Sequence, residues 1–343
     1  MDTEPVSALW TGRQDGEGPH HTRWHEAVRV KDPHQTDNDS YAAQQVSLLG
    51  FRTDEGIRRN NGRVGAADGP TALRRALAPF ALHGQMADGQ VRLTDYGDVV
   101  TEGEDLEAGQ AAAAQAITGA LDAPGAELAV VLGGGHETAW ASYQGLMNSA
   151  HMRAEDGRRP QWGVLNLDAH FDLRQESRPT SGTPFLQIAQ AEQAAGFPDL
   201  RYAVVGIAEP ANTGALFAQA RRLGVRWMTD VECAGAGAGG IARFIADFAA
   251  NLDVLYLTID LDLLPAAVAP GVSAPAALGV DTALVLAAVR AAAATRKLRL
   301  VDVVELNPPF DEQGRTARTA ARLIDEAVRT VLMVEPHNGF QND

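Results

Sequence analysis

The chain contains the stretch Gly163-Val164-Leu165-Asn166-Leu167-Asp168-Ala169-His170-Phe171-Asp172. Its first half is almost entirely apolar, which is typical of a strand buried on both faces of a parallel sheet. Its second half carries Asp168, His170 and Asp172 at every second position, so these side chains could project from one side of an extended backbone. The stretch therefore predicts a buried strand that ends in oxygen and imidazole donors.

Similar apolar runs recur along the chain. Together, the expected strands are Val91–Val100, Leu128–Leu132, Trp162–Leu167, Tyr202–Ile207, Val225–Met228, Val254–Ile259 and Leu298–Val304. The expected helices are Glu107–Leu121, Glu137–Ala150, Phe185–Ala195, Ala215–Leu223, Ile241–Asn251, Thr282–Thr295 and Ala317–Met333. Nearly continuous apolar strands alternating with helices are typical of a mostly parallel sheet covered on both faces, so we expect an α/β fold. The Gly-rich stretch Ala234–Gly240 is expected to be a loop with a helix start.

The composition narrows the classes of function. The 343 residues include 29 Lys and Arg and 44 Asp and Glu, a net charge of −15, which argues against a nucleic-acid partner. The single Cys233 excludes a disulfide framework and a cysteine-based zinc site. The N-terminus lacks the features of a secretion signal, and no apolar run approaches the roughly 18 residues that span a membrane. We therefore expect a cytoplasmic protein with no membrane partner.

Polar residues also follow three other expected strands. They are Gly133-Gly134-Gly135-His136-Glu137 after Leu128–Leu132, Asp260-Leu261-Asp262 after Val254–Ile259, and Glu305 after Leu298–Val304. Ligands of parallel α/β sheets bind beyond the carboxyl ends of the strands, so we expect these groups to meet there. Several carboxylates in one crevice would repel each other, and two divalent cations would offset their charge. Oxygen and imidazole donors without thiolates suit Mn²⁺, and two ions roughly 3.5–4 Å apart would generate a bound hydroxide near neutral pH.

Each of these features has an ordinary structural explanation when it is taken alone. A strand-end residue such as Asp168 is often a helix N-cap or a turn residue. Gly133–Gly135 could be a tight turn or a phosphate cradle, although it matches neither common nucleotide-binding motif. Glu305 could simply end a strand. The combination of four such strand ends favours a metal site.

In this order, the motifs at 133–137, 168–172 and 260–262 resemble the arginase/agmatinase ureohydrolase family of binuclear manganese enzymes, over about residues 50 to 335. The resemblance implies a three-layer α/β/α sandwich, two Mn²⁺ per subunit and a homo-oligomer. It places His136, Asp168, Asp172 and Asp260 on one ion and Asp168, His170, Asp260 and Asp262 on the other. It also implies that Glu305 holds the cationic amidine or guanidine head of a small-molecule substrate. Asp172 would pass a proton to the leaving nitrogen.

The domain organisation is expected to be simple. We expect one domain over residues 1–343, with an irregular N-terminal segment at 1–45 that is polar and broken by Gly and Pro. Residues 46–335 are expected to form the catalytic core.

One loop departs from the pattern of arginases and agmatinases, which usually carry a His-Gly pair after the second motif. Here the loop reads Ser181-Gly182-Thr183-Pro184-Phe185. Together with Gly56–Ala66, Leu9–Arg13 and Pro270–Pro275, it resembles the branch of the family that acts in histidine degradation. The resemblance implies attack of a metal-bridging hydroxide on a formimidoyl carbon, with release of formamide.

A substrate of this branch carries two carboxylates beside its amidinium group. Arg174 and Arg63 are candidate partners for them, because the planar guanidinium fork binds a carboxylate through two hydrogen bonds. Ser181 is a third candidate for substrate binding. Arg63, like Arg58 and Arg59, could equally pair with surface acids or with the sheet edge, whereas Arg174 is the favoured partner of the substrate. The remaining alternatives are an agmatinase, guanidinobutyrase or arginase type of ureohydrolase that releases urea, and a non-catalytic metal-binding homologue.

Overall fold

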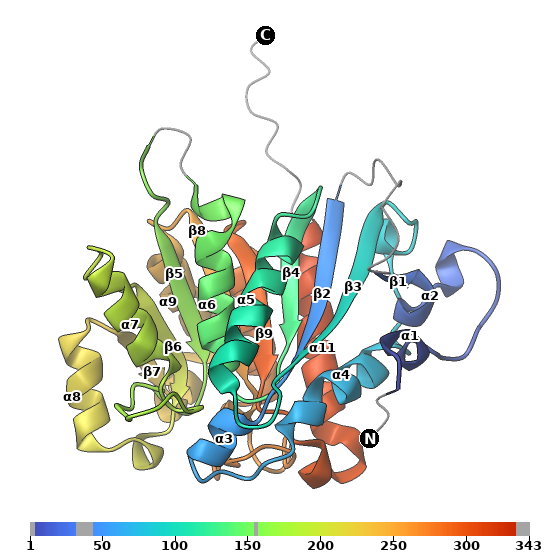
Figure 1. The fold of residues 1–343 in the computed structure, drawn as a ribbon. Coiled ribbons are helices and arrows are strands. Elements are labelled where there is room, and N and C mark those ends of the chain that lie inside the picture. Colours follow the sequence, from blue (N-terminus) through green and yellow to red (C-terminus); the bar gives the residue numbers. More distant parts are fainter. Residues whose placement is uncertain (1–3, 32–43, 154–156, 334–343) are drawn as a thin grey trace.

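The computed structural model describes residues 4–31, 44–153 and 157–333 (Figure 1). In these residues, nine parallel strands form one sheet in the order β1-β3-β2-β4-β9-β8-β5-β6-β7. The strands are β1 (Val28–Val30), β2 (Gln44–Arg52), β3 (Val91–Val100), β4 (Ala126–Leu132), β5 (Trp162–Leu167), β6 (Tyr202–Ile207), β7 (Arg226–Thr229), β8 (Val254–Asp260) and β9 (Leu298–Val304). The expected parallel α/β fold is therefore confirmed.

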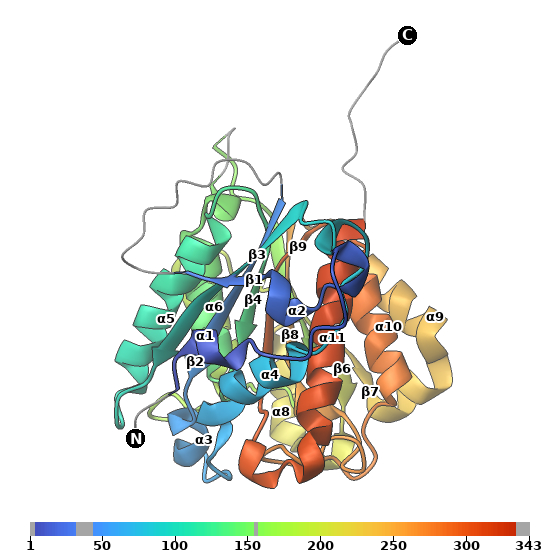
Figure 2. The ribbon, with the colours of Figure 1, turned by 90° about the vertical axis from the view of Figure 1, so that its right-hand side faces the viewer.

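Helices cover both faces of the sheet, so the fold has three layers (Figure 2). One face packs against α5 (Leu106–Leu121), α6 (Thr138–Asn148), α7 (Pro184–Ala194) and α8 (Gly214–Arg222). The other packs against α4 (Gly69–Leu77), α9 (Asp230–Ala249), α10 (Thr282–Ala293) and α11 (Arg315–Met333). Three short helices, α1 (Val6–Leu9), α2 (Trp24–Ala27) and α3 (Glu55–Arg59), lie nearer the N-terminus in sequence. None of the described helices combines the length and the apolar character needed to cross a membrane.

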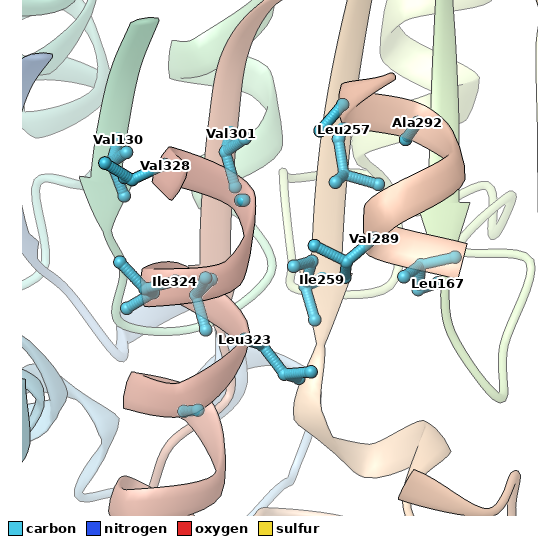
Figure 3. Close-up of a cluster of buried hydrophobic side chains, with 14 of the residues drawn as sticks. Val130, Leu167, Leu257, Ile259, Val289, Ala292, Val301, Leu323, Ile324 and Val328 are labelled. Carbon is cyan, nitrogen blue, oxygen red and sulfur yellow. The ribbon is translucent and has the colours of Figure 1, made fainter. Parts of the chain in front are cut away.

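Alternate residues of the strands supply the two hydrophobic layers. Val130 of β4 points into the layer beneath α10 and α11, whereas Val131 points into the layer beneath α5 and α6. Figure 3 shows the first layer, in which strand side chains meet the two helices, among them Val130, Leu257, Ile259, Val289, Val301, Ile324 and Val328. Burial on both faces explains why these strands are nearly continuous runs of apolar residues.

The structure differs from the sequence-based expectation in several places. The helices α3 and α4 are not among the expected helices, and Ala234–Gly240, expected to be a loop with a helix start, lies within α9. The strand β2 is not among the expected strands, and its polar ends and Gly50 obscure its pattern. The segment expected to be irregular contains α1, α2 and β1, and Trp24 of α2 is fully buried. The helix expected to start at Ile241 starts at Asp230 instead, and Gly237, with φ of 62°, interrupts it.

A buried ion pair joins α4 to β3. The Nε and Nη2 atoms of Arg74 donate to the two carboxylate oxygens of Asp95 at 2.7 and 2.9 Å, and Nη1 donates to Asp98 at 2.6 Å. Asp95 also accepts hydrogen bonds from the Trp10 indole and the Gly97 backbone. Burial disfavours the charged form of Arg74, but its partners outweigh this effect and raise its pKa above the ordinary value.

Candidate metal centre

Four neighbouring strands bring the predicted site residues to one edge of the sheet. In the order β4-β9-β8-β5, each strand ends beside the next. His136 follows β4, Glu305 follows β9, and Asp260 ends β8. Because all four strands are parallel, their carboxyl ends share the edge where α3 lies, at the bottom of Figure 1.

A first group of donors surrounds the imidazole of His136. Its Nδ1 atom lies 2.9 Å from a carboxylate oxygen of Asp172, 3.0 Å from one of Asp260 and 3.3 Å from one of Asp168. One ligand atom from each of the four residues lies within 4.8 Å of all the others. The group therefore has the composition expected of a site for a divalent cation.

A second group lies against the other oxygen of Asp168. The Nδ1 atom of His170 lies 3.1 Å from a carboxylate oxygen of Asp262 and 3.5 Å from Oδ1 of Asp168. Asp168 thus contributes to both groups, one oxygen to each. Asp260 belongs to the first group only, by the same 4.8 Å separation of ligand atoms. That Asp260 bridges two ions therefore stays a prediction.

Short-range hydrogen bonds orient these carboxylates and imidazoles. Asp168 accepts bonds from the His170 backbone at 2.6 Å and from the Asn166 side chain at 2.8 Å. Asp260 accepts one from the Asp262 backbone at 2.9 Å. Nε2 of His136 lies 3.0 Å from the Thr258 hydroxyl, which leaves Nδ1 to face the carboxylates.

Asn166 and Thr258 are not among the residues singled out from the sequence. Each lies two positions before a site aspartate in its strand, and side chains at that spacing point to the same side. That spacing is the signal that could have found them. A third buried group, Asp302, accepts hydrogen bonds from Ser142 and Tyr256 and lies in β9.

The backbone at two site residues is left-handed. Asp172 has φ of 47° and Glu305 has φ of 67°, in a region that Asp adopts fairly readily and Glu only rarely. β5 ends at Leu167, and the turn at Asp172 directs this side chain toward His136. The expected alternation therefore does not continue to Asp172, because the backbone is no longer extended there.

The electrostatics of the site are dominated by burial. Burial and the charges of neighbouring carboxylates raise the pKa of Asp172 and of Asp260 above the ordinary value. Burial alone would lower the pKa of His136, but the three surrounding aspartates outweigh it and raise this pKa well above its ordinary value. The protein therefore holds more negative charge here than its two imidazoles can balance.

Unsatisfied donor and acceptor atoms test whether the site fits a metal. Among the described residues, neither Nδ1 of His136 nor Oδ1 of Asp262 makes a hydrogen bond, although both are buried. Buried polar atoms are rarely left without a partner. A divalent cation would satisfy both atoms and would reduce the repulsion between carboxylates, so the residues present fit a hard or borderline ion such as Mn²⁺.

Glu305 lies beside this cluster in a nearly closed environment. The backbone N–H of His136 donates to its Oε1 atom at 2.9 Å, which fixes the carboxyl group. Burial, with the charges of Glu137 and Asp262, raises the pKa of Glu305 well above its ordinary value. A cationic ligand group would stabilise the carboxylate in this place.

Besides Glu305, three residues predicted to bind substrate lie on two loops. Arg174 is exposed, and among the described residues no hydrogen bond or ion pair joins its guanidinium. Arg63 donates to the backbone carbonyls of Val272 and Ser273 and stacks 4.2 Å from the Phe310 ring, so much of its guanidinium is already engaged. The Ser181 hydroxyl, in contrast, accepts a hydrogen bond from Asn60 at 3.2 Å. No finding assigns these residues a ligand.

Two hollows open near the centre, and they differ in charge. The larger, about 770 Å³, includes His170 and is lined by Glu209, Asp230 and Glu232 together with the apolar loop 274–279. The smaller, about 280 Å³, begins at Arg174 and is also lined by Arg178. Three acidic side chains thus line the larger hollow, whereas two arginines and one acid, Glu176, line the smaller one.

Comparison with known proteins agrees with this geometry. The arginase family model matches residues 44–329. The formimidoylglutamase of Nocardia farcinica is 50% identical over 93% of this chain and 95% of its own length, and that of Ralstonia nicotianae is 47% identical over 96% and 97%. Among solved structures, formimidoylglutamase from Bacillus subtilis superposes with a TM-score of 0.76 at 21% identity, covering 94% of both chains.

A second solved structure is formiminoglutamase of Trypanosoma cruzi, which contains Mn²⁺. It superposes with a TM-score of 0.74 at 23% identity, over 87% of this chain and 97% of that one. At these identities the two structures establish a shared fold, whereas the family match and the curated relatives cover nearly the whole length of this chain. The chain therefore belongs to the arginase family.

Proposed function

We propose that this protein is a manganese hydrolase that converts N-formimidoyl-L-glutamate and water to L-glutamate and formamide, a reaction of histidine degradation. The observation that carries the proposal is the convergence of the Asp168-centred donor groups and Glu305 at one sheet edge. The curated relatives at 43–50% identity are named for this activity, which supports the choice of substrate.

The proposed metal sites follow the two donor groups. His136, Asp168, Asp172 and Asp260 would hold one Mn²⁺, and Asp168, His170 and Asp262 would hold the other. The resemblance to the family adds Asp260 to the second set, as a bridge between the ions. When bound, two such ions supply a hydroxide nucleophile at neutral pH. Carboxylate and imidazole ligands without thiolates support manganese over zinc.

Glu305 and Asp172 would act directly on the substrate. Because the His136 backbone holds one oxygen of Glu305, the other oxygen is left to pair with the amidinium and to keep the formimidoyl carbon electrophilic. A C–O bond forms at that carbon while its bond to the glutamate nitrogen breaks. Asp172, whose side chain is 13% exposed, would accept the proton given up by the attacking water and transfer it to the departing nitrogen.

The carboxylate end of the substrate would lie near the smaller hollow, at Arg174. Two carboxylates are repelled by the hollow that contains Glu209, Asp230 and Glu232 and are attracted to Arg174. Arg174 has a free guanidinium among the described residues and follows Asp172 by two positions, so it is the stronger candidate. Arg63 would act mainly by holding the loop that contains Ser273.

The test is a parallel assay of the manganese-loaded protein with N-formimidoyl-L-glutamate, agmatine, guanidinobutyrate and arginine. Formamide and urea are measured separately. We expect formamide from the first substrate and little urea from the other three. Urea release from a guanidino compound at a higher kcat/KM would favour another ureohydrolase, and activity that survives exhaustive chelation would contradict the manganese centre.

We also propose the domain organisation, the oligomeric state and the cellular location of the protein. A single sheet that contains all nine described strands supports one domain with its catalytic core at 46–335. Resemblance to the family supports a homo-oligomer, and a small-molecule substrate of amino-acid breakdown supports a cytoplasmic location. Light scattering after size-exclusion chromatography measures the oligomeric state, and cell fractionation measures the location.

A further inference from the structure

The segment Thr53–Gly65, which includes α3, runs along the carboxyl edge of the sheet and contacts the loops after four strands. The contacts are Gly56 N to Glu137 Oε1 at 2.9 Å, Asn60 Nδ2 to Ser181 Oγ at 3.2 Å, Arg63 Nε to Ser273 O at 3.0 Å and Asn307 Nδ2 to Arg63 O at 2.7 Å. Glu137 and Asn307 are fully buried. The segment is therefore held on both sides of Asn60.

Close packing restricts the segment further. A Cβ atom at Gly134 would lie 1.8 Å from the carbonyl oxygen of Thr53, and one at Gly62 would lie 2.7 Å from both Ile57 and Ser273. The next residue after Asn60, Asn61, has φ of 58°. These constraints leave little freedom for Asn60, so its side-chain amide has a defined position.

The hydrogen bond from Asn60 determines what Ser181 can do. A hydroxyl group has one hydrogen to donate and lone pairs that accept. Because the amide N–H of Asn60 donates to Ser181 Oγ, the hydroxyl hydrogen must point elsewhere. Among the residues that the structure describes, the hydroxyl donates no hydrogen bond, and Ser181 is 8% exposed.

The loop that contains Ser181 begins and ends at the metal centre. It leaves at Asp172 and returns at Phe185, whose backbone N–H donates to the Asp172 carbonyl at 3.3 Å and whose ring lies edge-on to His136. Within it, Arg174 crosses the next residue after Ser181, since a Cβ atom at Gly182 would lie 2.9 Å from Arg174 Cδ. The loop that contains Ser181 therefore packs against Arg174, whose guanidinium is free among the described residues, at the rim of the site.

We infer that Asn60 is a positioning residue for substrate specificity: its amide turns the Ser181 hydroxyl into a donor for a carboxylate of the substrate. The inference rests on the proposed function, because only a substrate with carboxylates benefits from such a donor. Asn60 acts through Ser181 and does not contact the reacting atoms. It contributes to binding in the ground state and the transition state alike, so it affects KM and leaves kcat nearly unchanged.

The experiment compares two variants with two substrates, N-formimidoyl-L-glutamate and N-formimidoyl-butylamine, which has no carboxylate. In the Asn60→Ala variant we expect KM for the first substrate to rise about tenfold, with kcat within about twofold. We expect Asn60→Asp to raise KM about a hundredfold, because the new carboxylate accepts a hydrogen bond from the Ser181 hydroxyl and repels the substrate. For the butylamine derivative, kcat/KM stays within about twofold of wild type in Asn60→Ala.

The neighbouring Asn61→Asp variant is the matched control. It adds the same charge on the same segment, at an exposed residue whose left-handed backbone Asp tolerates. Bound manganese and the melting temperature are measured for every variant. If Asn60→Ala does not fold, Ser181→Ala replaces it, with the same expected rise in KM. The double variant of Ser181→Ala and Asn60→Asp should have the KM of Ser181→Ala, apart from the charge effect seen in the control.

The outcomes separate this inference from the proposed function. Wild-type protein that releases no formamide from N-formimidoyl-L-glutamate overturns the proposed function itself. An active wild type whose Asn60→Ala variant keeps its KM overturns the role of Asn60. So does an equal loss with the butylamine derivative, or an effect of Asn60→Asp no greater than that of Asn61→Asp.

Discussion

Two regions of this molecule bury charge, and they do so in opposite ways. At β3, the guanidinium of Arg74 meets two carboxylates, and Asp95 accepts four hydrogen bonds. At the carboxyl ends of β4, β5 and β8, four aspartates surround two imidazoles, and buried atoms of His136 and Asp262 remain without hydrogen bonds. The first region is complete within the protein, and the second lacks a positive charge.

The contrast separates a structural ion pair from a binding site. A buried charge is retained at low cost only when charge and hydrogen bonds are both balanced. In the Arg74 group the fully buried Arg74 and Asp95 balance each other, and the second carboxylate, Asp98, is 13% exposed. We therefore expect mutations there to change stability and not activity. The aspartate cluster meets this condition only with a bound cation, so we expect mutations there to change activity and metal affinity first.

The largest effect is expected for Asp168→Asn, which removes a carboxylate shared by both donor groups. We expect kcat/KM to fall by about 10⁴-fold, equivalent to about 5 kcal/mol. The metal-free variant should be less stable than metal-free wild type, because, against the effect of burial, His136 and His170 hold the pKa of Asp168 below its ordinary value and so favour its charged form. Steady-state kinetics and bound manganese check the first expectation, and urea unfolding checks the second. Activity near the wild-type level would remove Asp168 from the site.

The reverse experiment is Arg74→Met. It leaves Asp95 buried without its cation, and we expect the free energy of unfolding to fall by about 3–5 kcal/mol. Bound manganese and kcat/KM per folded molecule should not change. Chemical denaturation with an activity assay at low denaturant measures both. A loss of metal affinity that matched the loss of stability would contradict the proposed independence of the two regions.

Bound manganese should stabilise the protein through the aspartate cluster and not through the Arg74 group. At a free Mn²⁺ concentration 100 times its Kd, we expect the free energy of unfolding to rise by about 2.7 kcal/mol for each occupied site. The rise should be smaller in Asp262→Ala, which disrupts the second donor group, and unchanged in Arg74→Met. Thermal unfolding with and without chelator measures it. Equal stabilisation of wild type and Asp262→Ala would count against Asp262 as a ligand.

A third region with a buried carboxylate surrounds Glu192, and mutation there is expected to change the free energy of unfolding least. Burial alone would raise the pKa of Glu192, but hydrogen bonds from Arg159, Tyr143 and Trp162 outweigh it and lower this pKa. Its stabilising contribution is therefore present above the ordinary Glu pKa of about 4.3 and is lost as the pH falls through the lower folded-state value. We expect Glu192→Gln to cost about 1.5–2 kcal/mol at pH 7 and much less at pH 3. Thermal melts across this range measure the difference, and a constant difference would argue against the ion pair.

Much of the fold was predictable because burial on both faces leaves a strong local signal. The expected strand Val91–Val100 matches β3, and Trp162–Leu167 matches β5. β2 carries no comparable signal, since polar residues and Gly50 interrupt its apolar run. The N-terminal helices and β1 are held by distant contacts, such as the hydrogen bond from Trp24 to Asp325, and no local pattern specifies such contacts.

The members of the site were predictable from the strand ends, and the family resemblance also placed Asp172 with His136, but residue spacing alone did not give this grouping. Spacing of two suggested that Asp168, His170 and Asp172 project together, yet the turn at Asp172 sends that side chain to His136. Asn60 could not be linked to Ser181 from sequence, because 121 residues separate them and only the folded loops bring them into contact.

The sequence by itself determined the layered parallel fold, the family and the kinds of donor at the strand ends, because periodicity and motif chemistry are local properties. The tertiary structure decided which oxygen faces which imidazole, which buried charges balance and which do not, and which arginine is free. Those properties depend on strand order and on the paths of loops, where distances of a few ångströms set the electrostatic energy.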